Sequence, residues 1–337
     1  MQVAHTAKER LVKEMMHAVW RAGMVVLASA SFPLWAQYPD RPVTLMVPYA
    51  AGGPTDLAAR NLAFHADKAL GQKIIVMNRP GAQGALGSQQ VRNAAPDGYT
   101  LLIARVGAQA ALPAIDPATP YKWNDFTFLS VLELNPTACV VRAEEPARSL
   151  AELVEYMKRN PGKLNYSSSG EGSLPYMATQ LLFSLAGLGR DAAVNVPYKS
   201  DQDVVVAMLG GQVNFHCAST TALVNPVRSG RLRGLAVFMP ERMKEFPDVP
   251  TAREQGYADL EKVVGWSALY GPPGMAPALI EKWTKIMRSV AQDQGWVDGN
   301  TKFGGVPAVR SPADTERFAR EQFEVYSGLT KSLGIRP

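Results

Sequence analysis

Apolar residues cluster in short runs along the first third of the chain, and three of these runs have the length and composition of buried β-strands. They are residues 43–47, 73–77 and 100–104. Glycine-rich turns follow the first two runs, and each turn leads into a segment with the apolar spacing of a helix, which predicts a β-α-β-α-β unit. Ligands of open α/β sheets bind outside the carboxyl ends of the strands, so the turns 49–56 and 79–87 and Arg105 should border one pocket.

A second block, between residues 140 and 264, repeats the alternation of strand and helix at least three times, which predicts a mostly parallel sheet. The extended runs 126–141 and 263–270 flank this block, and each is able to carry the chain between two domains. We therefore expect an α/β protein with two lobes, two crossing segments and a ligand cleft between the lobes. The expected bounds are 37–139 plus 265–337 for lobe 1 and 140–264 for lobe 2.

The first 36 residues have the pattern of a secretory signal peptide. Four basic residues precede an apolar run at 22–35, which ends next to the small residue Ala36. The run has about 14 residues, fewer than the roughly 20 that a membrane-spanning helix needs, and an N-terminal membrane anchor is the alternative. We expect the mature chain to lie in the periplasm.

Charge and cysteine content limit the classes of partner. The formal net charge of +5 falls to about +3 without residues 1–36, which carry four basic and two acidic residues, and the other basic residues are scattered. This distribution argues against nucleic-acid binding. Cys139 and Cys217 both lie in strand-like runs, where two buried free thiols are the simpler expectation and a disulfide is the alternative in an oxidising compartment.

Candidates for catalysis are few. After residue 36 the chain has only two histidines: His65 is expected to be a surface or packing residue, and His216 a structural residue of a strand, with a ligand contact as the alternative. No HExxH, paired-cysteine, GxxxxGK(S/T) or GxSxG motif occurs, and no GxGxxG follows a strand. We therefore expect no catalytic residue, metal site or cofactor, although a secreted hydrolase with dispersed catalytic residues is an alternative class.

Glycine-rich turns favour anion binding instead. Residues 52–56 place two glycines before Pro54, a favourable first residue of a helix, so that free backbone N–H groups and the positive helix end face the strand tips. The turn 80–87 repeats that arrangement, and 169–173 adds hydroxyl and N–H groups from lobe 2. Close approach of a carboxylate to the backbone requires small residues, so the three turns together predict a carboxylate site. A tight turn without a ligand is the alternative for each turn alone.

Two charged residues border these turns. Asp56, in the first helical turn, is expected to cap the helix or hold the loop rather than to contact an anion. Arg105 follows a buried strand at its carboxyl end, where a guanidinium can form a bidentate pair with a carboxylate. A solvated surface arginine is the alternative.

Several ordered motifs match one protein family. They are YPDRP (38–42), PYAAGGPTD (48–56), NRPGAQG (78–84), PDGYTLL (96–102), SSG (168–170), VPYK (196–199), LGGQV (209–213) and PDVPT (247–251). With these motifs the chain after residue 36 resembles, over essentially its whole length, the extracytoplasmic substrate-binding receptors of the tripartite tricarboxylate transporters, known as Bug-type receptors.

The resemblance implies a type II periplasmic-binding-protein fold and a receptor, not an enzyme, that delivers a small carboxylate to membrane permease subunits. In such receptors the loops matching 49–56 and 80–84 hold one carboxylate, partly through ordered water, and the loop matching 168–173 closes over the ligand. The ligand-binding residues expected on this basis are Tyr49, Ala51, Gly52, Gly53, Pro54, Thr55, Asp56, Gly81, Ala82, Gln83, Gly84, Arg105, Ser168, Ser169, Gly170, Ser173 and Tyr198.

The sequence departs from the family pattern at two places. Asn214 and Ala218 stand where many relatives carry acidic residues, and Arg105 with residues 106–108 stands where small residues and a histidine are usual. Both departures favour a ligand with two negative charges. An aromatic dicarboxylate such as terephthalate or another phthalate isomer is the leading prediction. The alternatives are an aliphatic di- or tricarboxylate, and a receptor that signals ligand status to a membrane partner.

Overall fold

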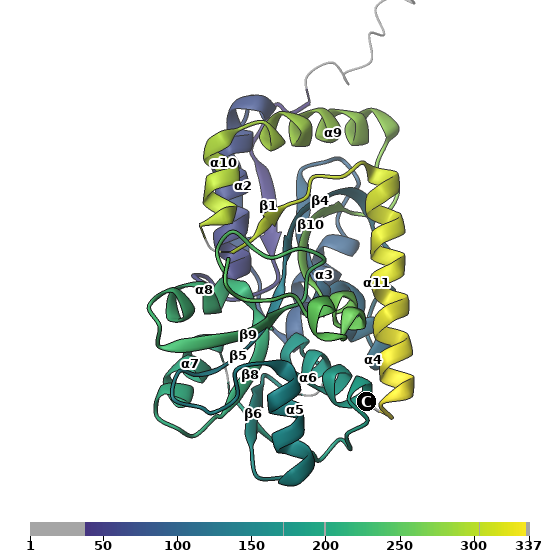
Figure 1. Ribbon diagram of the computed structural model, residues 1–337. Coiled ribbons are helices and arrows are strands. Elements are labelled where there is room, and N and C mark those ends of the chain that lie inside the picture. Colours follow the sequence, from purple (N-terminus) through teal and green to yellow (C-terminus); the bar gives the residue numbers. More distant parts are fainter. Residues whose placement is uncertain (1–37, 171, 199, 303, 335–337) are drawn as a thin grey trace, which may run out of the picture. The chain divides into compact units, whose positions relative to one another are not determined.

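The computed structural model describes residues 38–170, 172–198, 200–302 and 304–334. The predicted signal peptide, residues 1–36, lies outside these ranges. Among the described residues, no helix is both long enough and apolar enough to cross a membrane. From Pro42 on, the chain forms one unit that contains two β-sheets, with the six-stranded sheet in the upper half of Figure 1 and the five-stranded sheet in the lower half.

The six-stranded sheet has the strand order β11-β4-β10-β3-β1-β2, and we call this sheet with its helices lobe 1. Its strands are β1 (Val43–Val47), β2 (Ile74–Asn78), β3 (Thr100–Arg105), β4 (Thr127–Asn135), β10 (Gly265–Gly271) and β11 (Val306–Pro307). The three strands predicted from the apolar runs are β1, β2 and β3, and they are parallel, with β1 in the middle. β10 runs antiparallel to both β3 and β4, and β11 antiparallel to β4.

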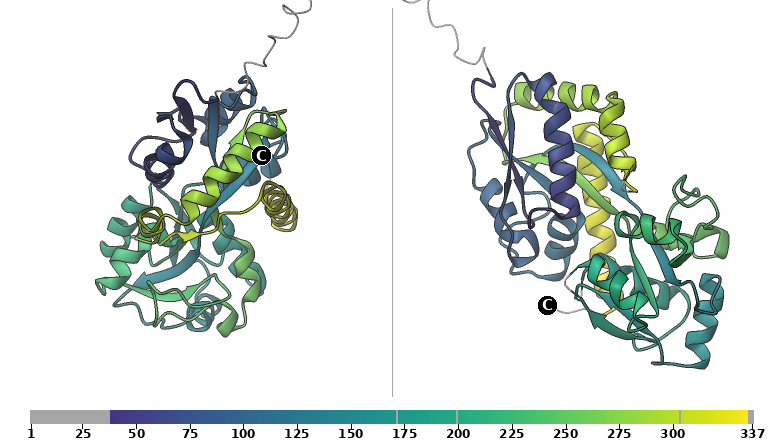
Figure 2. Two further views of the ribbon diagram at one scale, coloured as in Figure 1. Left: turned by 90° about the horizontal axis from the view of Figure 1, so that it is seen from above. Right: turned by 90° about the vertical axis from the view of Figure 1, so that its left-hand side faces the viewer.

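Helices flank this sheet (Figure 2). They are α2 (Pro54–Leu70), α3 (Ala85–Arg92), α4 (Leu112–Ile115), α9 (Pro277–Ala291), α10 (Gln294–Thr301) and α11 (Pro312–Ser332), with the short helices η2 (Ala82–Gly84) and η3 (Gly107–Ala111). Local sequence explains the bounds of α2: it begins after the extended residue Gly53 with Pro54 and ends at Gly71, whose φ of 78° is in the left-handed region. This start places the helix N-terminus at the carboxyl end of β1.

The five-stranded sheet has the order β7-β6-β8-β5-β9, and we call this sheet with its helices lobe 2. Its elements are β5 (Thr137–Arg142), α5 (Leu150–Arg159), β6 (Asn165–Ser168), α6 (Leu174–Leu185), β7 (Val194–Pro197), α7 (Asp201–Leu209), β8 (Phe215–Ser219), α8 (Thr220–Arg228), β9 (Leu232–Val237), η4 (Arg253–Gln255) and η5 (Ala258–Lys262). β6 is parallel to β7 and β8, but β5 is antiparallel to β8 and β9. The prediction of a mostly parallel sheet was therefore wrong for half of this sheet, because the strand that enters from lobe 1 runs in the opposite direction.

Pro136 separates the two sheets. The predicted extended run 126–141 consists of β4 and β5, which lie in different sheets and have only Pro136 between them. The chain returns to lobe 1 through β10, whose first residue, Gly265, pairs with Asn135. The two crossings therefore lie side by side. The predicted boundary between residues 139 and 140 falls inside β5, so the change of sheet comes earlier in the chain than expected.

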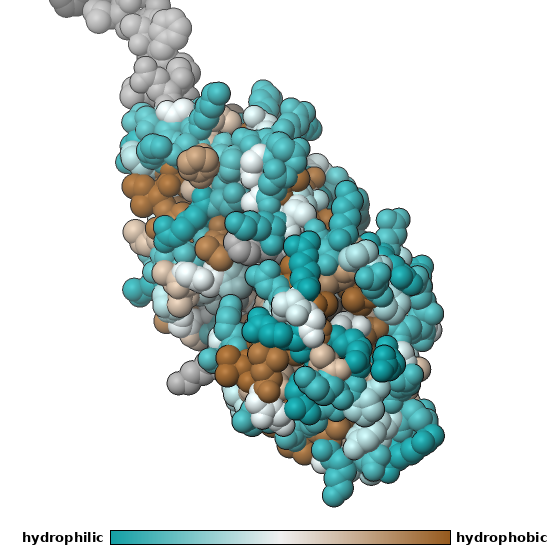
Figure 3. Space-filling model, turned by 60° about the vertical axis from the view of Figure 1, so that its left-hand side comes forward, coloured by the Kyte–Doolittle hydropathy of each residue, from teal (hydrophilic) through white to brown (hydrophobic). Residues whose placement is uncertain are grey.

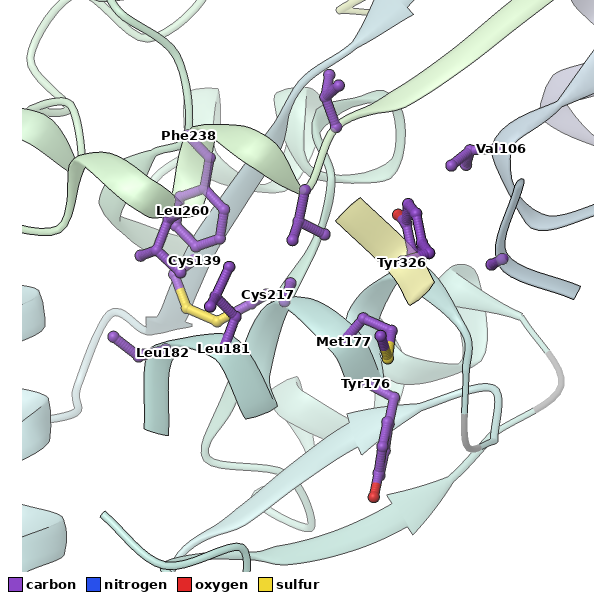
Figure 4. Close-up of a cluster of buried hydrophobic side chains, with 14 of the residues drawn as sticks. Val106, Cys139, Tyr176, Met177, Leu181, Leu182, Cys217, Phe238, Leu260 and Tyr326 are labelled. Atoms are coloured by element: carbon purple, nitrogen blue, oxygen red, sulfur yellow. A yellow bond between two sulfur atoms is a disulfide. The ribbon is translucent and has the colours of Figure 1, made fainter. Parts of the chain in front are cut away.

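Cys139 and Cys217 form a disulfide inside lobe 2, so the expectation of two free thiols was wrong. The two residues are paired across β5 and β8, and their Cα atoms are 4.0 Å apart. Figure 4 shows the disulfide among buried side chains of α6 (Leu181, Leu182), of η5 (Leu260) and of the segment after β9 (Phe238). The sequence places both cysteines on strands, but it does not give the strand order that makes them neighbours.

Hydrophilic residues cover most of the face in Figure 3, and hydrophobic patches interrupt them. The most exposed large apolar side chains in the described part of the chain are Phe64 on α2, at 78%, and Val206 on α7, at 70%. These two residues lie on different lobes, and isolated apolar groups of this kind are common on soluble proteins.

Replacing both cysteines by alanine should destabilise the protein by about 2–4 kcal/mol, because the disulfide closes a long loop in the unfolded chain. Urea unfolding followed by circular dichroism measures this difference. As a control, the wild-type protein unfolded without reductant should give no thiol titre with Ellman's reagent. Two reactive thiols under those conditions would contradict the disulfide.

Candidate functional site

Asn78, the last residue of β2, joins two of the turns predicted to bind a carboxylate. Its Nδ2 donates hydrogen bonds to the backbone oxygen of Tyr49 at 3.1 Å and to Oδ1 of Asp56 at 3.0 Å. The turn after β1 and the end of β2 are therefore fixed against each other at the carboxyl edge of the sheet. Asn78 was not among the residues predicted for the site, and its place at the start of the NRPGAQG motif is the signal for it in the sequence.

Asp56 holds the turn between β1 and α2. Its Oδ2 accepts hydrogen bonds from the backbone N–H of Gly52 at 2.9 Å and from Nε of Arg60 at 2.8 Å, and its Oδ1 accepts the bond from Asn78. Burial tends to raise the pKa of Asp56, but the three hydrogen bonds outweigh burial and hold this pKa below its ordinary value. The loop-holding role predicted for Asp56 is confirmed by these bonds, which occupy both carboxylate oxygens.

The N-terminus of α2 presents its free N–H groups beside this turn. Gly53 is extended, with φ −78° and ψ 170°, and no side chain caps the helix. Pro54 has no N–H to satisfy, and the N–H groups of the first turn are unpaired within the helix. Ala51, Gly52 and Pro54 are exposed, so an anion has access to these donors.

The turn after β2 has a left-handed backbone over four successive residues. Their φ values are 135° for Gly81, 46° for Ala82, 54° for Gln83 and 96° for Gly84. Ala82 and Gln83 are the only non-glycine residues with positive φ in the described part of the chain. Backbone conformations of this kind are costly outside glycine and gather at binding sites, which favours a ligand-binding role for this turn.

Tyr49 closes the space between this turn and the start of η3. Its hydroxyl donates to the backbone oxygen of Gln83 at 3.4 Å. A Cβ atom added to Gly84 would lie 3.1 Å from Cζ of Tyr49, and one added to Gly107 would lie 3.3 Å from its hydroxyl. Burial raises the pKa of Tyr49, while the positive charge of Arg105 and a hydrogen bond to the backbone of Ala108 lower it. Arg105 is thus an electrostatic neighbour of the Tyr49 hydroxyl.

Arg105 is fastened to the two strands that lead to lobe 2. Its Nη1 donates to Oδ1 of Asn135 on β4 at 2.7 Å and to Oγ of Ser267 on β10 at 3.0 Å. Oε1 of Glu133 lies 3.9 Å from the same nitrogen, and the side chain of Arg105 is 16% exposed. The alternative of a solvated surface arginine is therefore wrong. Glu133, Asn135 and Ser267 were missed by the sequence analysis, since nothing in the sequence brings them to Arg105.

Lobe 2 contributes a serine-rich loop before α6. Oγ of Ser168 accepts from the backbone N–H of Gly170 at 3.1 Å and donates to Oδ1 of Asn195 at 2.9 Å. Oγ of Ser173 donates to the backbone oxygen of Gly170 at 2.7 Å, and the backbone N–H of Tyr198 donates to the backbone oxygen of Ser168 at 3.0 Å. Ser169 is exposed. The predicted lobe 2 residues thus form one connected group at the carboxyl ends of β6 and β7.

The contacts between the lobes include one at Gly172 and one at Thr220. Gly172 approaches Ile115 of α4 so closely that a Cβ at Gly172 would overlap the Ile115 side chain. On α8, Oγ1 of Thr220 donates to the backbone oxygen of Gly304 at 2.9 Å. Within the described residues, no hydrogen bond joins the predicted lobe 1 site residues to the predicted lobe 2 site residues, so the two groups form separate halves of the candidate site.

A cavity of about 120 Å³ lies between the lobes beside the start of α2. Its lining residues are Pro54, Leu57, Ala58, Asn61, Glu133, Asn135, Thr221, Gly299, Asn300 and Gly305. Pro54 is the one residue of the predicted set among them. Glu133 and Asn135 connect this cavity to Arg105.

Asn214 does not belong to this region. It precedes β8, at the end away from Ser219 and α8, where its Oδ1 accepts from the backbone N–H of Asn165 at 2.8 Å and its Nδ2 donates to Glu145 at 3.2 Å. A five-residue strand spans about 16 Å, so Asn214 is remote from the end of the strand that meets lobe 1. Asn214 therefore does not remove an acid from the pocket, and Glu133 supplies an acid there that was not predicted from the sequence.

The two histidines have structural surroundings. His216 is fully buried in β8, with Nδ1 3.1 Å from the backbone oxygen of Ser167. Nδ1 of His65 lies 3.0 Å from Oδ2 of Asp293. Among the residues that the structure covers, no three His, Cys, Asp or Glu side chains are grouped so that they could hold a metal ion.

Comparison with known families gives a match over most of the chain. The model of the tripartite tricarboxylate transporter family receptor matches residues 58–335. The chain belongs to this receptor family. The curated relatives include BugT of Bordetella pertussis, which is 31% identical over 316 residues, covering 93% of this chain and 95% of BugT.

Several solved structures superpose on this receptor. MatC of Rhodopseudomonas palustris, solved with bound malate, is 30% identical with a TM-score of 0.75, covering 87% of this chain and 99% of MatC. A second R. palustris protein, solved with adipate, is 26% identical with a TM-score of 0.79, covering 89% of this chain and all of the other. The match to the periplasmic binding protein BugD, at 29% identity and a TM-score of 0.76, confirms the expected periplasmic-binding-protein fold with two α/β lobes.

Replacing Asp56 by asparagine should lower the stability of the receptor by about 1–3 kcal/mol at pH 7, because a buried carboxylate that accepts three hydrogen bonds is lost. The pKa of Asp56 is depressed in the folded state, so this contribution is complete above the ordinary carboxyl pKa and is lost as the pH falls through the folded value. Urea unfolding at several pH values measures it.

The matched control is Glu155→Gln, which removes an exposed carboxylate from another pair spaced four residues apart, Glu155 with Arg159. It should change stability by less than about 0.5 kcal/mol. An Asp56→Asn variant as stable as this control at pH 7 would show that the turn does not depend on Asp56.

Proposed function

We propose that this receptor captures a small carboxylate between its lobes and delivers it to the membrane permease subunits of a tripartite tricarboxylate transporter. The observation that carries the proposal is the meeting of two donor-rich turns, at Gly52–Asp56 and Gly81–Gly84, with Arg105 at one sheet edge. Backbone N–H groups at a helix start and a guanidinium are the groups that bind carboxylates in proteins. The signal-peptide pattern of residues 1–36 supports a periplasmic location, as is usual in this family.

The ligand we propose is a dicarboxylate. Malate and adipate, which the two R. palustris proteins hold, are both dicarboxylates. One carboxylate would bind the turns of lobe 1, and Arg105 would bind the second, since its Nε and Nη2 form no hydrogen bond with the described residues. An aromatic dicarboxylate such as terephthalate is the leading candidate. The alternative is an aliphatic dicarboxylate, because the ligands of the two R. palustris proteins are of that kind.

A receptor of this kind releases its ligand unchanged. A thermal-shift screen of aliphatic and aromatic mono-, di- and tricarboxylates would identify ligands, because a ligand that binds only the folded state raises the unfolding temperature. Mass spectrometry after long incubation should return the added compound intact. Conversion of the compound would instead support the hydrolase class, and a kinase response to ligand would support the signalling alternative.

Replacing Arg105 by alanine should weaken the binding of a dicarboxylate by about 10–100-fold, since a hydrogen bond to a charged group contributes about 1.5–3 kcal/mol. The matched monocarboxylate should lose much less affinity, because its single carboxylate binds the turns. Isothermal titration calorimetry with terephthalate and benzoate, and with adipate and hexanoate, measures both. Equal losses for the two members of each pair would rule out a contact between Arg105 and a second carboxylate.

Saturating ligand should bring the lobes together and reduce the radius of gyration in solution X-ray scattering, because each crossing is short enough to act as a hinge. The wild-type receptor without ligand is the reference. A radius of gyration that stays the same at saturation would argue against capture by closure.

A further inference from the structure

Glu133, Ser267 and Arg105 form a row across three adjacent strands, at the end of the lobe 1 sheet where β3 stops. Ser267 on β10 is paired with Glu133 on β4 at one side and with Arg105 on β3 at the other. Side chains of directly paired residues point to the same face of a sheet. Strand order thus aligns a carboxylate, a hydroxyl and a guanidinium.

Two side chains bridge the carboxylate and the guanidinium. Oγ of Ser267 accepts from Nη1 of Arg105 and donates to Oε1 of Glu133 at 2.9 Å. Oδ1 of Asn135 accepts from the same Nη1, and Nδ2 of Asn135 donates to the same Oε1 at 3.3 Å. Both bridges use one nitrogen of Arg105 and one oxygen of Glu133, so the other edge of the guanidinium stays available.

The network is shielded from water. Glu133 is 5% exposed, Asn135 3% and Ser267 fully buried. Charges at such sites interact over longer distances than they do in water, since fewer solvent dipoles screen them. The negative charge of Glu133 therefore opposes the attraction of an anion to Arg105, although it also holds Arg105 in place.

We propose that Glu133 is a specificity-determining residue of this receptor: by offsetting the charge of Arg105, it limits how strongly a second carboxylate of the ligand is preferred. This inference rests on the proposed function, because it assumes that Arg105 faces a ligand carboxylate. In this inference Glu133 acts through Arg105 and the residues that bridge them, and it is therefore a positioning residue. A purely structural role would alter mono- and dicarboxylate binding by the same factor.

The Glu133→Gln variant tests the charge alone, because glutamine keeps the oxygen that accepts from Ser267 and Asn135. It should increase the ratio of dicarboxylate to monocarboxylate affinity by about tenfold, on the scale of a unit charge acting at short range in a partly polar medium. The Glu133→Asp variant keeps the negative charge in this position and should leave the same ratio unchanged. A ratio that changes with glutamine but not with aspartate separates the charge of this carboxylate from the packing of its side chain.

Calorimetric titrations with terephthalate and benzoate, and with adipate and hexanoate, give the ratio of dicarboxylate to monocarboxylate affinity for each variant. Glu281→Gln is the control, since it removes the same charge from an exposed pair with Lys285 on α9 and should leave the ratio unchanged. If the wild type binds dicarboxylates but Glu133→Gln keeps its ratio, or if Glu133→Asp changes the ratio as much as Glu133→Gln does, Glu133 has no such role and the proposed function stands. A wild type that binds none of these carboxylates would overturn both.

Discussion

The antiparallel pair β4 and β10 is the constraint on which the rest of the receptor depends. These two strands lie inside the lobe 1 sheet and also carry the chain to lobe 2 and back, with Asn135 and Gly265 paired where they leave the sheet. The hydrogen bonds from Arg105 to Asn135 and Ser267 attach the end of β3 to both strands. The position of the candidate site relative to the crossings is therefore set by strand pairing and not by loops.

Features that depend on short stretches of sequence could be predicted. The strands β1, β2 and β3, the start of α2 at Pro54 and the loop-holding role of Asp56 each follow from a few neighbouring residues. Local rules suffice in these cases because a glycine-rich turn, a proline at the first helical position and a short apolar run act over less than ten residues. Local rules alone predicted a two-lobed α/β protein. The resemblance of the motifs to one family then predicted the type II periplasmic-binding-protein fold.

Features that depend on strand order and register were not predicted. Cys139 and Cys217 are 78 residues apart in sequence and become neighbours only because β5 lies next to β8. Glu133 and Ser267 meet Arg105 only because β10 lies between β4 and β3. Asn214 was predicted to border the pocket because it is close in sequence to residues that meet lobe 1. It instead precedes β8, at the end of the strand that is remote from lobe 1.

The carboxylate of Glu133 offsets part of the positive charge that Arg105 presents to a ligand. From the sequence it is a single cation at the end of a buried strand, which alone would favour any ligand with an additional negative charge. In the structure a buried carboxylate shares its hydrogen-bonding partners, and this pairing reduces the cost of keeping a guanidinium in the cleft while no ligand is bound. The same pairing leaves less of the charge of Arg105 uncompensated for a ligand. In the proposed binding mode, the N–H groups at the start of α2, which no side chain caps, attract the first carboxylate, and the balance between Arg105 and Glu133 sets the gain from a second.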